Sequence, residues 1–160
     1  MLKKRNSTYC FYRHLPQNLN VLVFEESVSN CVSIMAIAKR HSRISNLEIF
    51  HDLKNCYQHI SLTKADIVIL DVQFKGKLRF AQLRLLKAQF PFVHFLILSA
   101  IESDHVVFEA LHIGVSGYVI KSQLERDLST SIDEILNGGI ALSARISRKI
   151  INTLRNGSRV

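Results

Sequence analysis

Short, unbroken runs of apolar residues mark the interior of this chain. Continuous runs of this length are typical of strands buried on both faces, as in a parallel sheet. Leu47–Phe50 predicts a further, weaker strand because Glu48 interrupts it. The four clear runs are Val21–Phe24, Ile67–Leu70, Phe95–Leu98 and Tyr118–Ile120.

Helical spacing of apolar residues fills the segments between these runs. The segment Asp52–Leu62 is a less regular helix candidate, and Gly138 with Gly139 stops the last clear one. A strand and a helix thus alternate five times, which predicts an α/β fold, a doubly wound five-stranded parallel sheet with helices on both faces and right-handed crossovers. The clear helical patterns cover Val28–Ala38, Leu78–Leu86, Val106–Gly114 and Leu124–Leu136.

An extra C-terminal helix is predicted over residues 144–156, where Ile146, Ile150, Ile151 and Leu154 form one apolar side. Four such side chains need a cover, because burying each one is worth about 1.5–3 kcal/mol. Either the helix folds back on its own domain, or it packs against a second subunit or leads to an output domain. We favour a homodimer built on this helix or on the face formed by roughly Asp104–Leu136.

The length of 160 residues fits one domain. We divide the chain into an N-terminal extension (1–19), a core domain (20–139) and a C-terminal helix with a basic tail (140–160). No apolar stretch reaches the roughly 18 residues of a membrane helix. The three cysteines lack metal-type spacing and their number is odd, so we expect reduced thiols in a cytoplasmic protein.

The net charge of +8 comes from the two ends of the chain. All 13 acidic residues lie between Glu25 and Glu134, so the core is close to neutral and does not need DNA to explain it. Solvated termini are the simpler interpretation of the basic ends. DNA contacts through these ends remain an alternative, although one short basic helix is a weak signal.

Polar side chains follow the predicted strands where each one ends. Ligands bind at the carboxyl ends of strands in open α/β sheets, so we expect these groups to converge. Clustered carboxylates repel one another, and Mg²⁺ would relieve that repulsion and let a carboxylate attack a phosphoryl group. Each residue alone would be an ordinary turn, cap or surface residue; the converging set is Glu25, Glu26, Asp71, Ser99 and Lys121.

Four segments in this order resemble the CheY-like receiver domain of response regulators, closest to the NarL/FixJ class. The resemblance covers roughly residues 20–139 and rests on VLVFEES, ADIVILDV, HFLILSA and GVSGYVIKS. It implies a phosphoacceptor at Asp71, a phosphoryl-binding hydroxyl at Ser99, a switch aromatic at Tyr118 and a phosphoryl-binding Lys121. Receivers of that class usually precede a helix-turn-helix domain, so DNA binding would come only through an output domain that is not visible in this chain.

The expected function is that of a two-component response regulator, not an enzyme. A sensor histidine kinase or phosphotransfer protein would phosphorylate Asp71 and so switch a protein-interaction or dimer surface, which could regulate transcription. We expect Mg²⁺ as the cofactor, held by Glu26, Asp71 and the Gln73 carbonyl, with Glu25 acting mainly through water.

The sequence departs from the family pattern next to the predicted site residues, which keeps a second interpretation open. Both acidic-pair positions are Glu where the family usually has Asp, and Val72–Lys77 replaces a Met-Pro-Gly type loop. The alternative is a degenerate receiver that acts as a constitutive, phosphorylation-independent interaction module. A dinucleotide-binding or hydrolytic enzyme is disfavoured, because the first strand is followed by two acids without glycine and no G-x-S-x-G motif occurs.

Overall fold

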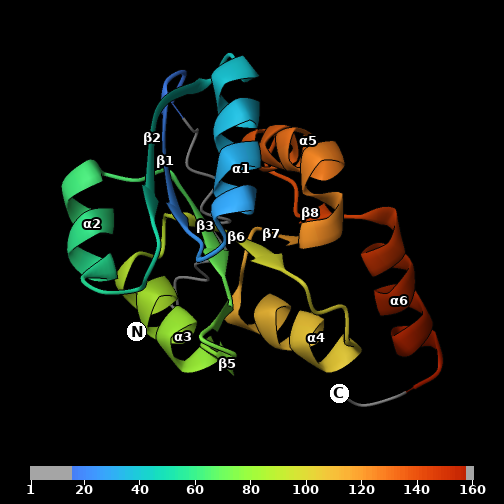
Figure 1. Cartoon of the computed structure of the whole chain (residues 1–160). Helices are drawn as coiled ribbons and strands as arrows, with labels where there is room; N and C mark the ends of the chain where they lie inside the picture. The colour runs from blue at the N-terminus through green and yellow to red at the C-terminus, as the bar shows by residue number, and fades with distance from the viewer. Residues whose placement is uncertain (1–15, 158–160) are drawn as a thin grey trace, which may run out of the picture.

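A fully parallel sheet of six strands runs through the centre of the molecule (Figure 1). The computed structural model describes residues 16–157, and the strand order is β2-β1-β3-β6-β7-β8. The predicted parallel α/β sheet is therefore confirmed, with one strand more than expected. The strands are β1 (Leu19–Phe24), β2 (Ile44–Phe50), β3 (Ile67–Asp71), β6 (His94–Ser99), β7 (Gly117–Ile120) and β8 (Ala141–Leu142).

The unexpected sixth strand has only two residues. Ala141 and Leu142 pair with Gly117 and Tyr118 at the edge of β7. The approach is close, since a Cβ atom on Gly117 would lie 2.6 Å from a Leu96 methyl carbon and 2.8 Å from the Ala141 carbonyl oxygen. A strand of two residues has no period, which is why the apolar pattern did not reveal it.

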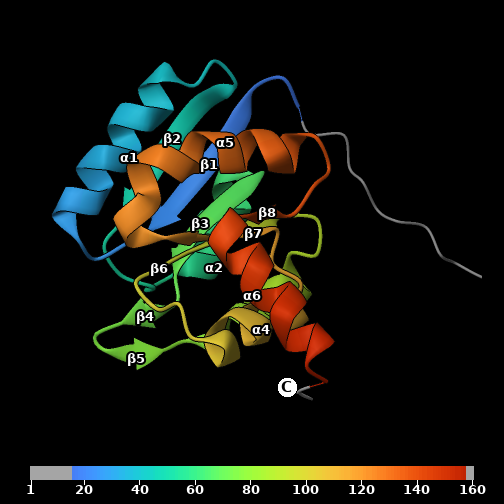
Figure 2. The ribbon, with the colours of Figure 1, turned by 90° about the vertical axis from the view of Figure 1, so that its right-hand side faces the viewer.

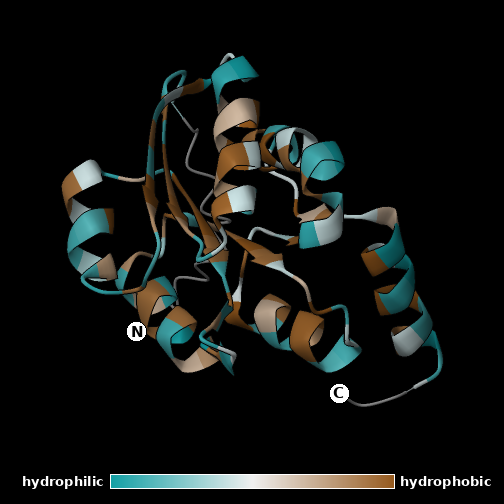
Figure 3. Cartoon of the chain, in the orientation of Figure 1, coloured by the Kyte–Doolittle hydropathy of each residue, from teal (hydrophilic) through white to brown (hydrophobic). Residues whose placement is uncertain are grey.

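Helices cover both faces of the sheet, as predicted. One apolar core lies between the sheet and α1 and α5, and the other between the sheet and α2, α3, α4 and α6. In Figure 3 the central strands are mostly apolar, and the helices that surround them carry both polar and apolar residues. The helices are α1 (Val28–Arg40), α2 (Cys56–Thr63), α3 (Phe80–Gln89), α4 (Asp104–Ile113), α5 (Leu124–Leu136) and α6 (Ala144–Arg155), with a 3₁₀ turn η1 (Lys121–Gln123) before α5.

The apolar residues of α1 lie on both its exposed and its buried sides. Val28, Val32 and Met35 are exposed, whereas the buried face is formed by Cys31, Ile34, Ile37 and Ala38. Helix α2 begins later than predicted, because Asp52 caps a turn through the Lys54 N–H and Asn55 adopts a left-handed conformation with φ 56°.

A short hairpin follows the third strand of the sheet. The segment after Asp71 forms a small antiparallel hairpin of β4 (Gln73–Phe74) and β5 (Lys77–Leu78), which the sequence did not predict. Its turn residues Lys75 and Gly76 have φ values of 49° and 69°, as a two-residue type I′ hairpin requires.

Helix α6 folds back on its own domain. It crosses in front of the β7–β8 edge and runs alongside α4 (Figure 2). Ile146 is fully buried and Ile150 is partly buried against the core, while Ile151 and Leu154 are 48% and 68% exposed. The fold-back arrangement, one of the two expectations for this helix, is therefore the one observed. Within residues 16–157, no helix combines the length and apolar character needed to cross a membrane.

Candidate functional site

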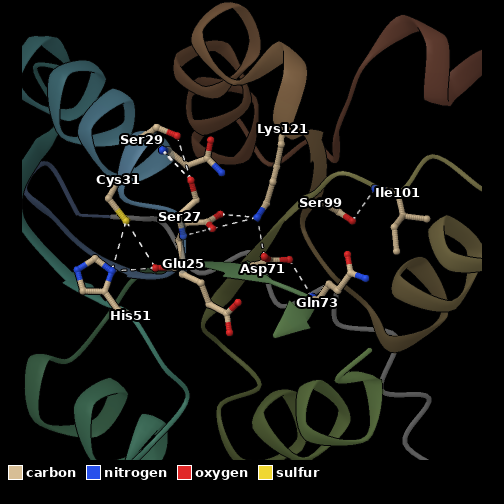
Figure 4. A network of polar contacts seen from close by, with 12 residues as sticks. Glu25, Ser27, Ser29, Cys31, His51, Asp71, Gln73, Ser99, Ile101 and Lys121 are labelled. Atoms are coloured by element: carbon tan, nitrogen blue, oxygen red, sulfur yellow. Dashed lines mark hydrogen bonds and ion pairs between the residues drawn. The ribbon is translucent and has the colours of Figure 1, made fainter. Parts of the chain in front are cut away.

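Four neighbouring strands bring the predicted site residues together at one edge of the sheet (Figure 4). Glu25 follows β1, Asp71 ends β3, Ser99 ends β6 and Lys121 follows β7. The expected convergence is thus observed. Glu25, Asp71 and Lys121, but not Ser99, border an open cleft of about 440 Å³, which is lined by Glu25, Glu26, Ser27, Asp71, Gln73, Gly76 and Lys121.

A lysine bridges two buried carboxylates at the centre of this cleft. The Lys121 ammonium nitrogen lies 2.6 Å from Oδ2 of Asp71, and 3.0 Å and 2.8 Å from the two carboxylate oxygens of Glu25. The Glu25 and Asp71 side chains are only 1% and 5% exposed. One positive charge therefore compensates two negative charges that have little access to water.

Burial and hydrogen bonding together set the pKa values of Asp71 and Lys121. Burial raises the pKa of the Asp71 carboxyl above its usual value, although the hydrogen bonds from Lys121 and from the Gln73 N–H oppose the rise. Burial by itself would lower the pKa of Lys121, but its hydrogen bonds to Asp71 and Glu25 outweigh this and raise it. Lys121 therefore stays charged at neutral pH and can attract an anionic group to Asp71.

Glu25 is held rigidly by its surroundings. Its Oε1 atom accepts a hydrogen bond from the Ser27 N–H at 2.8 Å, and Ser27 in turn caps the start of α1. Its backbone carbonyl lies 3.2 Å from Nδ1 of His51 and 3.6 Å from the Cys31 thiol. Glu25 is thus fixed by the protein itself, and it contacts Lys121 directly.

Glu26 and the β4–β5 hairpin form the outer wall of the cleft. The Lys75 N–H donates to Oε1 of Glu26 at 2.8 Å, and the Gln73 N–H donates to Oδ1 of Asp71 at the same distance. The left-handed turn at Lys75 presents this N–H to Glu26. The Lys75 and Lys77 side chains are exposed, so their charges lie at the rim of the site.

Ser99 and Tyr118 are both tied to one loop residue, Ile101. The Ile101 N–H donates to the Ser99 hydroxyl at 3.0 Å, and the Tyr118 hydroxyl donates to the Ile101 carbonyl at 2.7 Å. Tyr118 has no exposed surface, and burial raises its pKa to about 12. Tyr118 therefore occupies an inward position in this structure, without any modification of Asp71.

The oxygen ligands at this edge fit Mg²⁺ in kind, because carboxylate and carbonyl oxygens are what it prefers. Glu26, Asp71 and Gln73 all line the same cleft. In residues 16–157, however, no three acidic, histidine or cysteine side chains are grouped closely enough to hold a metal ion. The Lys75 N–H occupies one carboxylate oxygen of Glu26, so the other oxygen is the one that could face an ion.

Sequence reasoning did not identify several contributors to this site. Ile101 acts through its backbone, and so does the N–H of Lys75, so neither position carries a side-chain signal. Cys31 and His51 lie behind Glu25. Burial, the largest cause, and the nearby Glu25 charge raise the pKa of the Cys31 thiol, so it supports the site as a neutral group.

Known proteins that are similar to this chain include regulators of transcription and signalling. No model of a known protein family matches the chain. The glycerol metabolism activator of Pseudomonas putida is 30% identical over 83 residues, which cover 52% of this chain and 38% of the activator. The nitrate/nitrite response regulator homolog of Haemophilus influenzae is 27% identical over 109 residues, covering 66% of this chain and 52% of that protein. The chain thus spans about half, or less, of these relatives.

Solved structures support the fold. The isolated receiver domain of RcsB from Salmonella enterica, in the presence of the phosphomimetic BeF₃⁻, has a TM-score of 0.75 and 17% identity and covers 82% of this chain and 97% of that one. A structure of RcsB dimers on DNA has the same TM-score and identity, covering 82% of this chain and 67% of that one. The chain therefore has the fold of a receiver domain, and it is similar in sequence to response regulators.

Proposed function

We propose that the chain is the receiver of a two-component response regulator and that Asp71 accepts a phosphoryl group. The observation that carries this proposal is the position of Asp71. It ends a central strand, lines an open cleft and lies 2.6 Å from the Lys121 ammonium. The donor would be a sensor histidine kinase or a phosphotransfer protein, and the protein acts as a signalling switch rather than as an enzyme.

The proposed step is a displacement at phosphorus. A carboxylate oxygen of Asp71 forms a bond to the phosphorus, and the bond to the donor's imidazole nitrogen breaks with its electron pair staying on that nitrogen. Lys121 stays charged and neutralises a phosphoryl oxygen, and the Ser99 hydroxyl donates to another. Mg²⁺, when bound by Glu26, Asp71 and the Gln73 carbonyl, would supply charge neutralisation for the transferred group.

Incubation of the full chain with Mg²⁺ and a small phosphodonor, followed by intact-mass measurement, tests this proposal. We expect the wild type to gain the mass of one phosphoryl group and Asp71→Asn to gain none. Asp66→Asn is the matched control, because Asp66 is also buried. Asp66 lies just before β3, at the opposite end of the strand from Asp71, and its carboxylate accepts a hydrogen bond from the Asn20 N–H. A gain that persists in Asp71→Asn would refute Asp71 as the acceptor.

A second candidate is a degenerate receiver that works as a constitutive interaction module. One specific observation favours it, because Tyr118 is already buried and bonded to the Ile101 carbonyl without any modification. This candidate predicts no mass gain in the wild type with any phosphodonor. The same experiment therefore separates the two functions.

The homodimer also belongs to this proposal. RcsB forms dimers on DNA, and it shares the fold of this chain. We propose that this chain self-associates through the face formed by α4, β7 and α5. Regulation of transcription would then require an output domain on the same or another chain.

A further inference from the structure

Helix α6 is tied to the loop between β6 and α4 by side chains along one of its faces. The Lys149 ammonium donates to the Glu102 carbonyl at 2.6 Å and lies 3.3 Å from the Asp104 carboxylate. Arg145 pairs with the Glu102 carboxylate at 2.9 Å, and the Thr153 hydroxyl donates to Asp104 at 3.2 Å. Three residues of α6 thus bind Glu102, in the loop, and Asp104, the first residue of α4.

Apolar contacts and a cap fix α6 in the same place. The Ser143 hydroxyl caps the helix by accepting the Ile146 N–H at 3.2 Å, directly after β8. Ile146 is fully buried in the core cluster that also contains Val106 of α4 and Tyr118 of β7. The helix therefore lies across part of the α4–β7 face, with its polar contacts directed to the loop.

The same loop is held from the other side by the two switch residues. Ile101, the neighbour of Glu102, donates its N–H to Ser99 and accepts the Tyr118 hydroxyl at its carbonyl. A movement of the Ser99 hydroxyl toward Asp71 would either stretch its bond to Ile101 or draw the loop along. The loop can follow only if the contacts between α6 and Glu102 or Asp104 yield.

We propose that α6 is an intrachain clamp that holds the β6–α4 loop and opposes the engagement of Ser99 with a phosphorylated Asp71. The proposal rests on the proposed function, because it concerns the regulation of that site. The two states compete for one loop, so the coupling is reciprocal: phosphorylation loosens α6, and loosening α6 favours the phosphorylated arrangement. Release of α6 also uncovers part of the α4–β7 face.

Binding of beryllofluoride with Mg²⁺ to the full chain tests the clamp, together with hydrogen exchange of residues 144–155. We expect beryllofluoride to speed amide exchange in this segment of the wild type. The double variant R145Q/K149Q should exchange faster there without any ligand, and it should bind beryllofluoride about five-fold more tightly or better. Glu102→Gln breaks the Arg145 ion pair from the loop side and should shift affinity in the same direction by less.

Arg148→Gln is the matched control, because Arg148 is exposed on the same helix and is not among these contacts. It removes one positive charge from α6, where R145Q/K149Q removes two, and it should leave affinity and exchange as in the wild type. If R145Q/K149Q loosens α6 yet binds beryllofluoride no better than the wild type, the clamp is refuted while the proposed function stands. If neither protein binds beryllofluoride, the proposed function fails and the clamp falls with it.

Discussion

Lys121 is the residue on which the electrostatics of the site depend. Its ammonium is the cation that contacts both Glu25 and Asp71, whose side chains are almost completely buried. Removing one partner of a buried ion pair leaves the other charge without compensation, which costs more than the pair contributes. The stability of the fold and the chemistry of the acceptor are therefore linked at this position.

Lys121→Gln should lower the free energy of unfolding by about 3 kcal/mol at pH 7. Without the ammonium, the already raised pKa of Asp71 rises further. A carboxyl whose pKa is higher in the folded state loses stability as pH rises from the ordinary value of 3.8 to the folded value. The deficit should therefore shrink from pH 7 toward pH 4, as urea unfolding at several pH values would show. A deficit that is constant with pH would contradict this account.

The Tyr118 hydroxyl should ionise at a higher pH than an ordinary tyrosine, and this should make the stability of the fold depend on pH in the alkaline range. Its pKa is raised from 10.0 to about 12 in the folded protein, so the unfolded chain releases this proton first. Stability should fall as pH rises from 10 to 12, by on the order of 2 kcal/mol. Tyr118→Phe should remove this pH dependence of stability. It should also remove the part of the tyrosinate absorbance that appears at the highest pH in a titration of the folded protein.

The same substitution has a separate cost at neutral pH. Tyr118→Phe leaves the Ile101 carbonyl without its hydroxyl donor, which should lower stability by about 1 kcal/mol. Tyr57→Phe is a suitable control, since Tyr57 is 37% exposed. In the alkaline titration, a Tyr118 hydroxyl that ionises near pH 10 in the folded protein would contradict the burial of this side chain.

At the scale of helices and strands, the sequence was most informative where burial is two-sided. The unbroken runs of β1, β3, β6 and β7 have no solvent-facing side and therefore stand out. In α1 the apolar pattern does not identify the buried face, because apolar residues lie on both its buried and its exposed sides. The site side chains were predictable from the strand ends, whereas the N–H of Lys75 and the carbonyl of Ile101 depend on loop shapes that side chains do not encode.

Helix α6 offers a matched pair of apolar residues for measuring what its docking contributes. Ile146 is fully buried, whereas Leu154 is 68% exposed. Ile146→Ala should cost about 2–5 kcal/mol through lost burial and the cavity it leaves. Leu154→Ala should change stability by less than about 0.5 kcal/mol. Equal costs in thermal or urea unfolding would mean that α6 does not dock as described.

At the scale of the whole molecule, α6 decides which surface is available for association. It covers part of the α4–β7 face and leaves Ile151 and Leu154 exposed at its outer side. We therefore expect the unmodified chain to be monomeric in sedimentation equilibrium and to dimerise with beryllofluoride and Mg²⁺. Ile150→Glu places a charge in the α6 contact with the core and should weaken docking. A wild type that stays monomeric at high concentration under both conditions would rule the dimer out.

The two-residue strand β8 has a consequence for the solution behaviour of the chain. It pairs with Gly117 and Tyr118, so the backbone of β7 is partly covered instead of facing water. A buried, apolar strand with an open edge is a template for adding strands from other molecules. Chains cut before Ala141 should therefore aggregate through that edge. The segment that connects α5 to α6 thus also protects the sheet from pairing with strands of other molecules.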